Sequence, residues 1–448
     1  MAIFDRREFL KSSLKSGLLA VGGLALPSWM PRLAFGAPDQ SPRGDTLVVI
    51  FMRGAADGMN IVVPYSAAEY HSARTRIGLD EPNKGTSASV IDLGSVDGRN
   101  PVAFGFNPVL TKMKELWDEK ALAVVHAVGS PDPTHSHFDA MDYMERGTPG
   151  EKQIPTGWLA RHLASVATTN NSPFRAVGMG GTVQAALRGP IPATALQSIA
   201  TYHLNGKPQE IAKIQATLAA LYQGTSVVEE QGQETFEALD IIKTIGAGGA
   251  YVPARGAQYP TTGYGQALQT VAQLIKADVG LEVACVDIGG WDTHAGEGDA
   301  TPNGNNLPAL LDQLQNGLHA FYTDMGDRMN QTLVVTMSEF GRRLADNASN
   351  GTDHGHGNVM FLLGGGVNGG KVYTDWPGLA PNQLYGPGDL AITTDFRDVL
   401  GEVVRMRLGN NRLDQVFPNY TSFKTLNVVK PRSLKLEAYL PQIVVAAR

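Results

Sequence analysis

The clearest chemical signal in this sequence is the glycine-flanked segment Gly351-Thr-Asp353-His354-Gly-His356-Gly357. It places one carboxylate and two imidazoles within four residues, and zinc and manganese bind ligands of these types in proteins. The glycines allow the backbone to turn tightly, so neighbouring side chains could reach one ion. The segment predicts a metal site, with a histidine-rich surface loop as the alternative.

Further donors of the same kind occur elsewhere in the chain. Asp292 and His294 are separated by one residue in a glycine-containing segment, so a carboxylate and an imidazole can face one point. Asp57 and Glu339 each follow a short apolar run and could bind a hard or borderline cation. For these segments the alternatives are a surface loop, an Asp-Gly turn and solvated charges.

Ser136 is the candidate nucleophile. A helix is expected to begin near it, and a hydroxyl at a helix N-terminus lies beside free backbone N–H groups and the positive end of the helix dipole. The same N–H groups could hold the anionic group of a phosphate or sulfate ester. The alternative is that Ser136 only caps the helix, since the acidic Asp139 follows three residues later.

Two arginines and three polar residues complete the predicted site. Arg53 and Arg342 could hold the non-bridging oxygens of an ester, because a guanidinium can bind two oxygens at once. His135 and His137 flank the candidate nucleophile and, with Asn60, are expected to surround the metal ligands.

Short apolar runs precede or follow most of these residues and are predicted to be buried strands, parallel to one another. Leucines and other apolar residues at three- and four-residue steps predict helices over 268–275 and 307–325. This alternation predicts an α/β fold, a doubly wound, mostly parallel sheet with helices on both faces. Ligands of such sheets bind at the carboxyl ends of the strands, which is where the candidate residues fall. The predicted strands are 46–51, 121–125, 281–286, 333–336 and 359–363.

The composition excludes several classes of protein. With 448 residues, 43% hydrophobic and 18% charged, the chain has too much apolar content for a disordered protein. A net charge of -6 argues against a nucleic-acid partner. The single cysteine, Cys285, excludes a disulfide within the chain.

The N-terminal residues 1–37 are predicted to be a twin-arginine signal peptide, and 38–448 the mature domain. Arg6 and Arg7 precede an apolar stretch that is too short to span a membrane, and small residues near 36–37 suit cleavage. We therefore expect the translocase of that pathway as a partner, a periplasmic or secreted location, and no stable membrane span in the mature form. The leader's five basic and two acidic residues give it a charge of +3, so its removal takes the net charge from -6 to -9. Residues 205–263 are predicted to be an insertion, helical and then looped.

The chain resembles family 1501 of the domains of unknown function, which are twin-arginine-exported members of the alkaline-phosphatase-like clan. This clan includes sulfatases, nucleotide pyrophosphatases and metal-dependent phosphomutases. The resemblance extends over nearly the whole mature chain. It rests on the motifs at 48–65, 136–140, 290–294, 338–342, 351–357, 394–397 and 416–418.

The resemblance implies two adjacent metal ions with a Ser, Thr or formylglycine nucleophile between them. Asp57 then corresponds to the clan's first-strand carboxylate, Ser136 to its nucleophile and His356 to its last histidine ligand. Asp292 and His294 correspond to an Asp and a His that hold one metal. Glu339 corresponds to a carboxylate that the clan also has at this strand end. The clan has a histidine at the next position, where this chain has Phe340, so His354 or Asp353 would substitute for that histidine. Formylglycine is not expected, because Cys285 lacks the sulfatase context.

These observations predict an exported hydrolase of phosphate or sulfate esters that uses one or two divalent ions, Zn, Mn, Mg or Ca. Its substrate would be a small anionic ester or a polysaccharide. The alternative is a non-catalytic exported binding protein that keeps the clan fold and at most one structural metal. An oxidoreductase is disfavoured, because no dinucleotide-binding glycine pattern follows the first predicted strand.

Overall fold

The structure is a computed structural model that describes residues 45–432, apart from positions 169, 205–207, 225, 248 and 299. The predicted signal peptide over 1–37 lies outside the described residues. Within the described part of the chain, no helix combines the length and the apolar character needed to cross a membrane.

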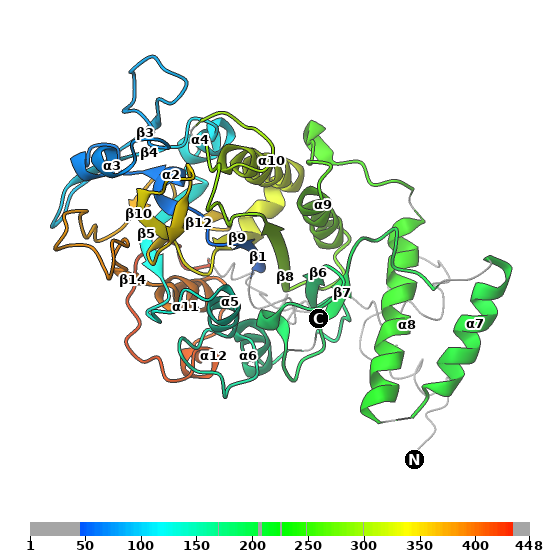
Figure 1. The fold of residues 1–448 in the computed structure, drawn as a ribbon. Helices are drawn as coiled ribbons and strands as arrows, with labels where there is room; N and C mark the ends of the chain where they lie inside the picture. The colour runs from blue at the N-terminus through cyan, green and yellow to red at the C-terminus, as the bar shows by residue number, and fades with distance from the viewer. Residues whose placement is uncertain are drawn as a thin grey trace, which may run out of the picture. The chain divides into compact units, whose positions relative to one another are not determined.

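A nine-stranded sheet forms the centre of the domain, as Figure 1 shows. Eight strands lie in the order β13-β5-β12-β9-β1-β8-β6-β7, and β14 also pairs with β5. In this order, with β14 last, the strands span Val372–Tyr373, Leu122–Gly129, Asn358–Gly364, Thr332–Met337, Thr46–Arg53, Val283–Gly289, Ala176–Met179, Thr194–Leu196 and Thr394–Asp395.

The sheet is mostly parallel, which confirms the predicted fold class. β1 pairs in parallel with both neighbours, Val48 lying opposite Val334 of β9 and Ala284 of β8. The predicted strand at 359–363 differs from expectation, because β12 runs antiparallel to both β5 and β9. Its first residues therefore lie at the edge where the parallel strands end, and the segment before β12 reaches the same edge as the segments that follow the others.

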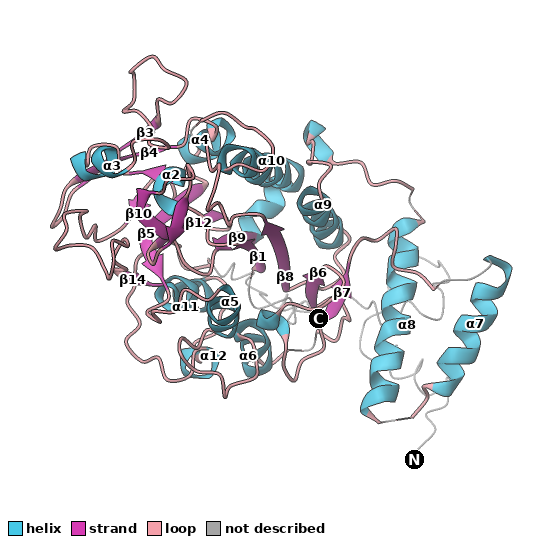
Figure 2. Ribbon diagram, viewed as in Figure 1, coloured by secondary structure: helices cyan, strands magenta, loops and turns pink. Residues whose placement is uncertain are grey.

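Helices cover both faces of the sheet (Figures 1 and 2). Side chains alternate along β1, so Val48 and Ile50 pack in one apolar cluster and Leu47 and Val49 in another. Helices α4 (Thr111–Asp118), α9 (Gly263–Lys276) and α10 (Leu307–Met325) contribute to the first cluster. The second takes residues from α5 (His137–Arg146), α6 (Trp158–Ser165), α11 (Phe396–Met406) and α12 (Leu413–Val416).

The segment over 205–263 contains two helices, α7 (Pro208–Leu221) and α8 (Val227–Gly246), followed by a loop with a 3-10 turn at Ala254–Gly256. The loop is fastened to α10, because the Asp324 carboxylate accepts hydrogen bonds from the hydroxyls of Tyr251 and Tyr259 at 2.7 and 2.8 Å.

Smaller elements complete the described fold. They are the helices α2 (Gly58–Ile61) and α3 (Ala68–Ala73), the sheet of β2 (Val62–Val63), β4 (Val102–Phe106) and β3 (Ile91–Val96), the pair β10 (Arg342–Asp346) and β11 (Thr352–His354), and 3-10 turns at Ala185–Leu187 and Gly326–Gln331.

Candidate metal centre

The carboxyl ends of β1, β8 and β9 form the edge of the sheet that carries the candidate site. Asp292 and His294 follow β8, Glu339 follows β9, and His354 ends β11 shortly before the antiparallel strand β12. The close approach of these segments depends on Gly54, which has a φ of 120°. Gly54 lies so near the segment after β8 that a Cβ atom on it would be 2.6 Å from the amide nitrogen of Asp292. A side chain at this position would therefore push the two segments apart.

Four side-chain atoms converge at this edge. The Oδ1 atom of Asp292 lies 3.2 Å from Nε2 of His294, 3.5 Å from Nε2 of His354 and 3.6 Å from Nε2 of His137. His137, Asp292 and His354 form a group whose ligand atoms all lie within 4.8 Å of one another. His294 joins this group from the side of His354, its Nε2 atom lying 2.8 Å from that of His354. The structure thus brings together the predicted ligands His294, Asp292 and His354. His137, which was expected to surround the metal ligands, is instead one of the converging donors.

Hydrogen bonds on the far side of the rings orient two of these histidines. Nδ1 of His137 lies 2.7 Å from Oε1 of Glu339, and Nδ1 of His354 lies 3.0 Å from the backbone oxygen of His135. Both partners are acceptors, so each Nδ1 carries a proton, and in the neutral form of each ring Nε2 presents a lone pair to the cluster. Such outer hydrogen bonds are usual for histidines that bind metal ions. Glu339 therefore holds a histidine in place instead of facing the cluster itself.

The protonation behaviour of the cluster follows from these contacts. The hydrogen bond to Glu339 raises the pKa of His137, which outweighs the opposing effect of burial. Burial, together with the nearby positive charge of Arg342, lowers the pKa of His354 and keeps that ring neutral. Burial alone would raise the pKa of Asp292, but the hydrogen bond and charge of Arg342 lower it overall. Asp292 is thus an anion, as a metal ligand must be.

The cluster fits a divalent ion on a further ground. The Nε2 atom of His137 is buried and has no hydrogen-bond partner within the described chain. A buried polar atom without a partner is costly, and a metal ion would supply the missing one. The donor set of imidazole nitrogens and a carboxylate oxygen is the set that zinc and its neighbours bind.

Arg342 is engaged by the protein and does not face an open anion site. Its side chain is fully buried, and Nη2 lies 2.6 Å from Oδ1 of Asp292. The guanidinium also donates to backbone oxygens around the site: Nη2 to Gly54 at 2.6 Å and Trp291 at 3.2 Å, Nε to Ala55 at 2.7 Å and Nη1 to Thr352 at 3.1 Å. These hydrogen bonds of Arg342 connect the loops after β1 and β8 to β11.

Phe340 forms an apolar wall against three histidine rings. Its ring stacks on His137 at 5.0 Å between centroids and lies 4.9 Å from His354 and 5.9 Å from His135. The Phe340 ring thus limits how these imidazoles can turn. His135 itself lies beside Asp389, with 3.3 Å between Nε2 and Oδ2.

Asp389 is a neighbour of the site that the sequence did not indicate. It is fully buried, and burial raises its pKa although His135 and Arg343 oppose this. No acidic-histidine motif surrounds it, so composition and spacing offered no signal.

Ser136 lies at the start of α5, as the sequence predicts. It is the N-cap of the helix, and its Oγ accepts a hydrogen bond from the amide of Asp139 at 3.5 Å. The side chain is exposed, and the next residue is the cluster histidine His137. The capping contact that was the alternative for this serine is therefore present, and the hydroxyl stays open to solvent.

Two predicted residues after β1 are placed away from the cluster. Asp57 is fully buried in an ion pair with Arg74, whose Nη2 atom lies 2.9 Å from its Oδ1. Asn60 donates to the backbone oxygen of Ile77 at 2.9 Å and accepts from the hydroxyl of Tyr70 at 2.7 Å. Both side chains are fully occupied by contacts inside the protein.

The remaining predicted residues lie at the border of the cluster or outside it. Oδ1 of Asp353 lies 3.6 Å from Nδ1 of His294, on the side of that ring that faces away from the cluster. His356 stacks on Tyr385 at 4.4 Å, and burial lowers its pKa to about 4. Aromatic stacking and burial, rather than a shared ion, account for the surroundings of His356.

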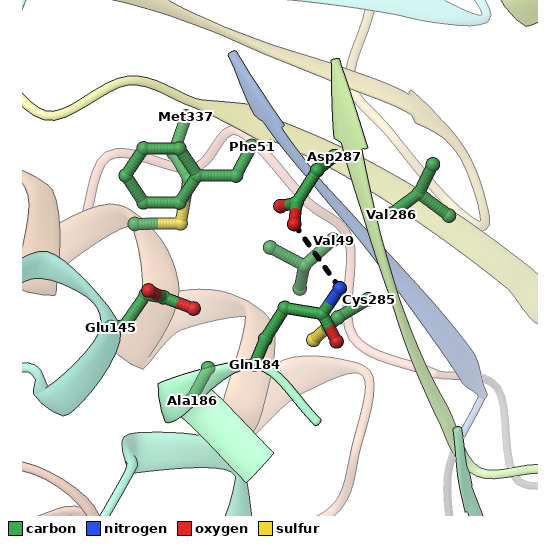
Figure 3. Close-up of a pocket in the computed structure, with 9 residues that line it drawn as sticks. All are labelled: Val49, Phe51, Glu145, Gln184, Ala186, Cys285, Val286, Asp287 and Met337. Atoms are coloured by element: carbon green, nitrogen blue, oxygen red, sulfur yellow. Dashed lines mark hydrogen bonds between the residues drawn. The ribbon is translucent and has the colours of Figure 1, made fainter. Parts of the chain in front are cut away.

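Arg53 belongs to a separate polar group. Its guanidinium lies 3.1 Å from Glu145 and 2.8 Å from Asp287. Figure 3 shows these two carboxylates around a small pocket with Gln184, whose Nε2 atom donates to Asp287 at 3.2 Å, and with Cys285. Its volume of about 10 Å³ suits roughly one water molecule. None of the four converging donor atoms lines this pocket.

Comparison with protein families gives one match over most of the chain. The model of a family described as "Protein of unknown function (DUF1501)" matches residues 45–402. This range includes all the residues of the cluster and confirms the resemblance seen in the sequence. No curated protein matches the chain.

Comparison with solved structures finds distant similarity. The PsFucS1 sulfatase from Pseudoalteromonas sp. is 12% identical, with 90% of this chain and 76% of that chain covered and a TM-score of 0.36. Ps i-CgsB, solved in complex with k-i-k-neocarrahexaose, is 13% identical, with 74% and 68% covered and a TM-score of 0.34. The alkaline phosphatase from the Antarctic bacterium TAB5 is 10% identical, with 73% and 93% covered and a TM-score of 0.27.

Proposed function

We propose that this protein, which belongs to the DUF1501 family, is a metal-dependent hydrolase of phosphate or sulfate esters. The observation that carries the proposal is the convergence of Asp292 Oδ1 with the Nε2 atoms of His137, His294 and His354. A divalent ion bound there would polarise the ester group and ease deprotonation of the attacking hydroxyl.

The protein's own charges support an anionic substrate. Arg342 neutralises Asp292, and the Nε2 atoms of His294 and His354 lie 2.8 Å apart beside it. Once a divalent ion is added, the immediate surroundings of Asp292 are positive. A positive site at the open edge of the sheet attracts phosphate and sulfate groups.

Ser136 is the proposed nucleophile. It precedes a ten-residue helix, so the free N–H groups of the first turn of α5 can hold an anionic oxygen beside its exposed hydroxyl. Glu339 holds His137, the residue after Ser136, in one tautomer, which fixes the direction of the Nε2 atom of His137. We do not assign Arg53 and Arg342 to the substrate, because carboxylates and backbone oxygens occupy their guanidiniums.

We further propose that the protein acts outside the cytoplasm. The support is the arginine pair at 6–7 with the apolar stretch and small residues that follow it, which together resemble a twin-arginine signal. The substrate would then be an extracellular small ester or an esterified polysaccharide.

A non-catalytic binding protein is the second candidate. The observation that favours it is the capping contact between Ser136 Oγ and the amide of Asp139, which gives the serine a structural reason to be present. In that case the cluster would hold a structural ion.

A substrate screen separates the two candidates. The full-length exported protein is loaded with zinc or manganese and assayed against aryl phosphate monoesters, diesters and aryl sulfates. Ser136→Ala and His354→Ala are compared with His203→Ala, a matched control at an exposed histidine. Hydrolysis that is lost in the first two variants and kept in the third supports the hydrolase.

The remaining outcomes are equally informative. A protein that binds metal but hydrolyses none of the esters supports the binding protein. A protein that hydrolyses esters equally well after chelation refutes metal dependence. Because removal of a serine N-cap costs about 1 kcal/mol of stability, the melting temperature of Ser136→Ala is measured alongside its activity.

A further inference from the structure

We infer that the cluster binds a single divalent ion of the zinc type, and that Arg342 takes the place of a second cation beside Asp292. This inference rests on the metal site of the proposed function and specifies its number of ions and their chemical class. It is drawn from the directions of the lone pairs and from the contacts of the guanidinium.

The first step is the direction of the histidine lone pairs. His354 faces a backbone oxygen with Nδ1, so its Nε2 atom is unprotonated. His294 lies between two carboxylates, with Nε2 3.2 Å from Asp292 Oδ1 and Nδ1 3.6 Å from Asp353 Oδ1. These two Nε2 atoms lie only 2.8 Å apart. So close a contact needs either a proton between the two nitrogens or a cation that both bind, and the second arrangement uses the lone pairs of both rings.

The second step is the spacing of the donors. Ligands bound tetrahedrally to zinc at about 2.0–2.1 Å lie roughly 3.3–3.5 Å from one another. The observed separations between Asp292 Oδ1 and the Nε2 atoms of His294, His354 and His137 are 3.2, 3.5 and 3.6 Å. Three donors at these distances from Asp292 Oδ1 fit one ion, around which the Nε2 atoms of His294 and His354, now 2.8 Å apart, would separate.

The third step is the type of ion. Magnesium and calcium prefer six or more oxygen ligands, whereas imidazole nitrogens suit zinc, cobalt, nickel and copper. Three of the four converging atoms are imidazole nitrogens. The remaining oxygen belongs to a carboxylate whose charge a guanidinium already balances. A hard, oxygen-seeking ion would therefore bind weakly here.

The fourth step is the exclusion of a second ion. Arg342 lies 2.6 Å from Asp292 and is buried and bound to backbone oxygens, so it cannot move aside for an ion without leaving those oxygens unpaired. The carboxylate of Glu339 is also engaged by the protein. Its Oε1 atom accepts from Gly54 N at 2.9 Å and lies 2.7 Å from Nδ1 of His137. A second ion beside Asp292 would therefore have to displace Arg342 or break the contacts of Glu339.

Metal titration of the unmodified protein tests the inference directly. The chelator-treated protein is dialysed against zinc, cobalt, manganese, magnesium or calcium, and bound metal is measured by mass spectrometry. We expect one zinc or cobalt per chain, an increase in melting temperature with these two ions, and no comparable effect of magnesium or calcium. Bound cobalt should show the intense visible absorption of a four-coordinate site.

Variants assign the result to the named residues. His354→Ala should lose the bound ion, whereas His356→Ala, a histidine two residues away that stacks on Tyr385, should keep it. Arg342→Lys retains one positive charge and should keep a stoichiometry of one. Arg342→Met, where it folds, frees Asp292 and should bind zinc more tightly.

Two equivalents of tightly bound metal, or preferential binding of magnesium or calcium, would overturn the inference. Because these results come from the unmodified protein, they do not depend on whether a variant folds. The test is also separable from that of the proposed function. A protein that binds one zinc ion but hydrolyses no ester would refute the proposed function and support this inference. A protein whose ester hydrolysis requires two ions would support the function and refute the inference.

Discussion

Replacement of Glu339 by glutamine tests how the protein supports its metal site. The carboxylate is buried and lies 2.7 Å from Nδ1 of His137, so it adds basicity to that ring. Glutamine has the same shape but carries no charge. Glu339→Gln therefore removes the charge while it keeps the packing.

The surrounding contacts allow this change without a rearrangement. The amide oxygen of glutamine can accept from Gly54 N and from His137 as Oε1 does now. The amide nitrogen would face Ser338 Oγ, which already donates to the backbone oxygen of Met52 at 2.7 Å and so can accept. The expected loss of stability is then only the difference between a charged and a neutral hydrogen bond, about 1 kcal/mol.

The expected effect on metal binding is larger. Loss of an outer partner of a metal-binding histidine typically weakens metal affinity by about 10- to 100-fold. This corresponds to roughly 1.4–2.7 kcal/mol of binding free energy. In the metal-free protein, the pKa of His137 should fall, because the hydrogen bond and charge of Glu339 now raise it.

Two measurements check this prediction. Competition with a chromophoric chelator gives the zinc dissociation constant, and the ring NMR signals of His137 give its pKa. Glu282→Gln is the matched control, because Glu282 is paired with Arg175 at 3.0 Å just before β8 begins, at the end of that strand opposite to Asp292. An unchanged zinc affinity in Glu339→Gln, with His137 still more basic than usual, would refute the proposed role of Glu339.

Three further outcomes are expected. Asp57→Asn removes the carboxylate paired with the buried Arg74, leaving Glu297 as its acidic neighbour, and should cost up to about 3–5 kcal/mol of unfolding free energy by denaturant titration, while zinc stoichiometry stays the same. A lower stoichiometry in this variant would show that Asp57 contacts the ion. Burial lowers the pKa of His126 to about 4, so the unfolded chain takes up a proton between roughly pH 6.5 and 4 that the folded chain does not, and stability falls as the pH drops. By pH 5 the loss is about 2 kcal/mol, and His126→Gln should flatten this part of the pH–stability curve; an unchanged slope would contradict the assignment. His356→Ala should lower the melting temperature through lost stacking and leave zinc affinity unchanged by competition titration, whereas a weaker affinity would place His356 in the cluster.

The sequence alone identified the type of fold and the edge of the sheet that matters. Buried strands and amphipathic helices follow from local apolar patterns, because an element must bury its own apolar face wherever it packs. For this reason the strands at 46–51 and 333–336 lie within β1 and β9. The same patterns do not give the direction of a strand, so the antiparallel course of β12 was not predicted.

The candidate ligands were recognised by residue type and short spacing, which are properties of the sequence. Asp292, His294 and His354 were identified in this way, and the structure brings them within hydrogen-bond or near-contact distance. His137 was expected around the ligands, because one imidazole beside a serine says little about which way its ring turns. Its place in the cluster depends on Glu339, which lies 202 positions further along the chain.

Tertiary structure alone decided which charged groups remain free to act. Asp57 and Asp292 both follow strands of the sheet, and each has a guanidinium as its partner, from Arg74 and Arg342 respectively. Only Asp292 also faces histidine rings, because long-range packing places the segments after β8 and before β12 side by side. Local sequence encodes what a side chain can bind, whereas its partners come from segments that are distant in the chain. A charge that is removed from water must find a partner. That partner then determines whether the charged residue stabilises the fold or contributes to a binding site.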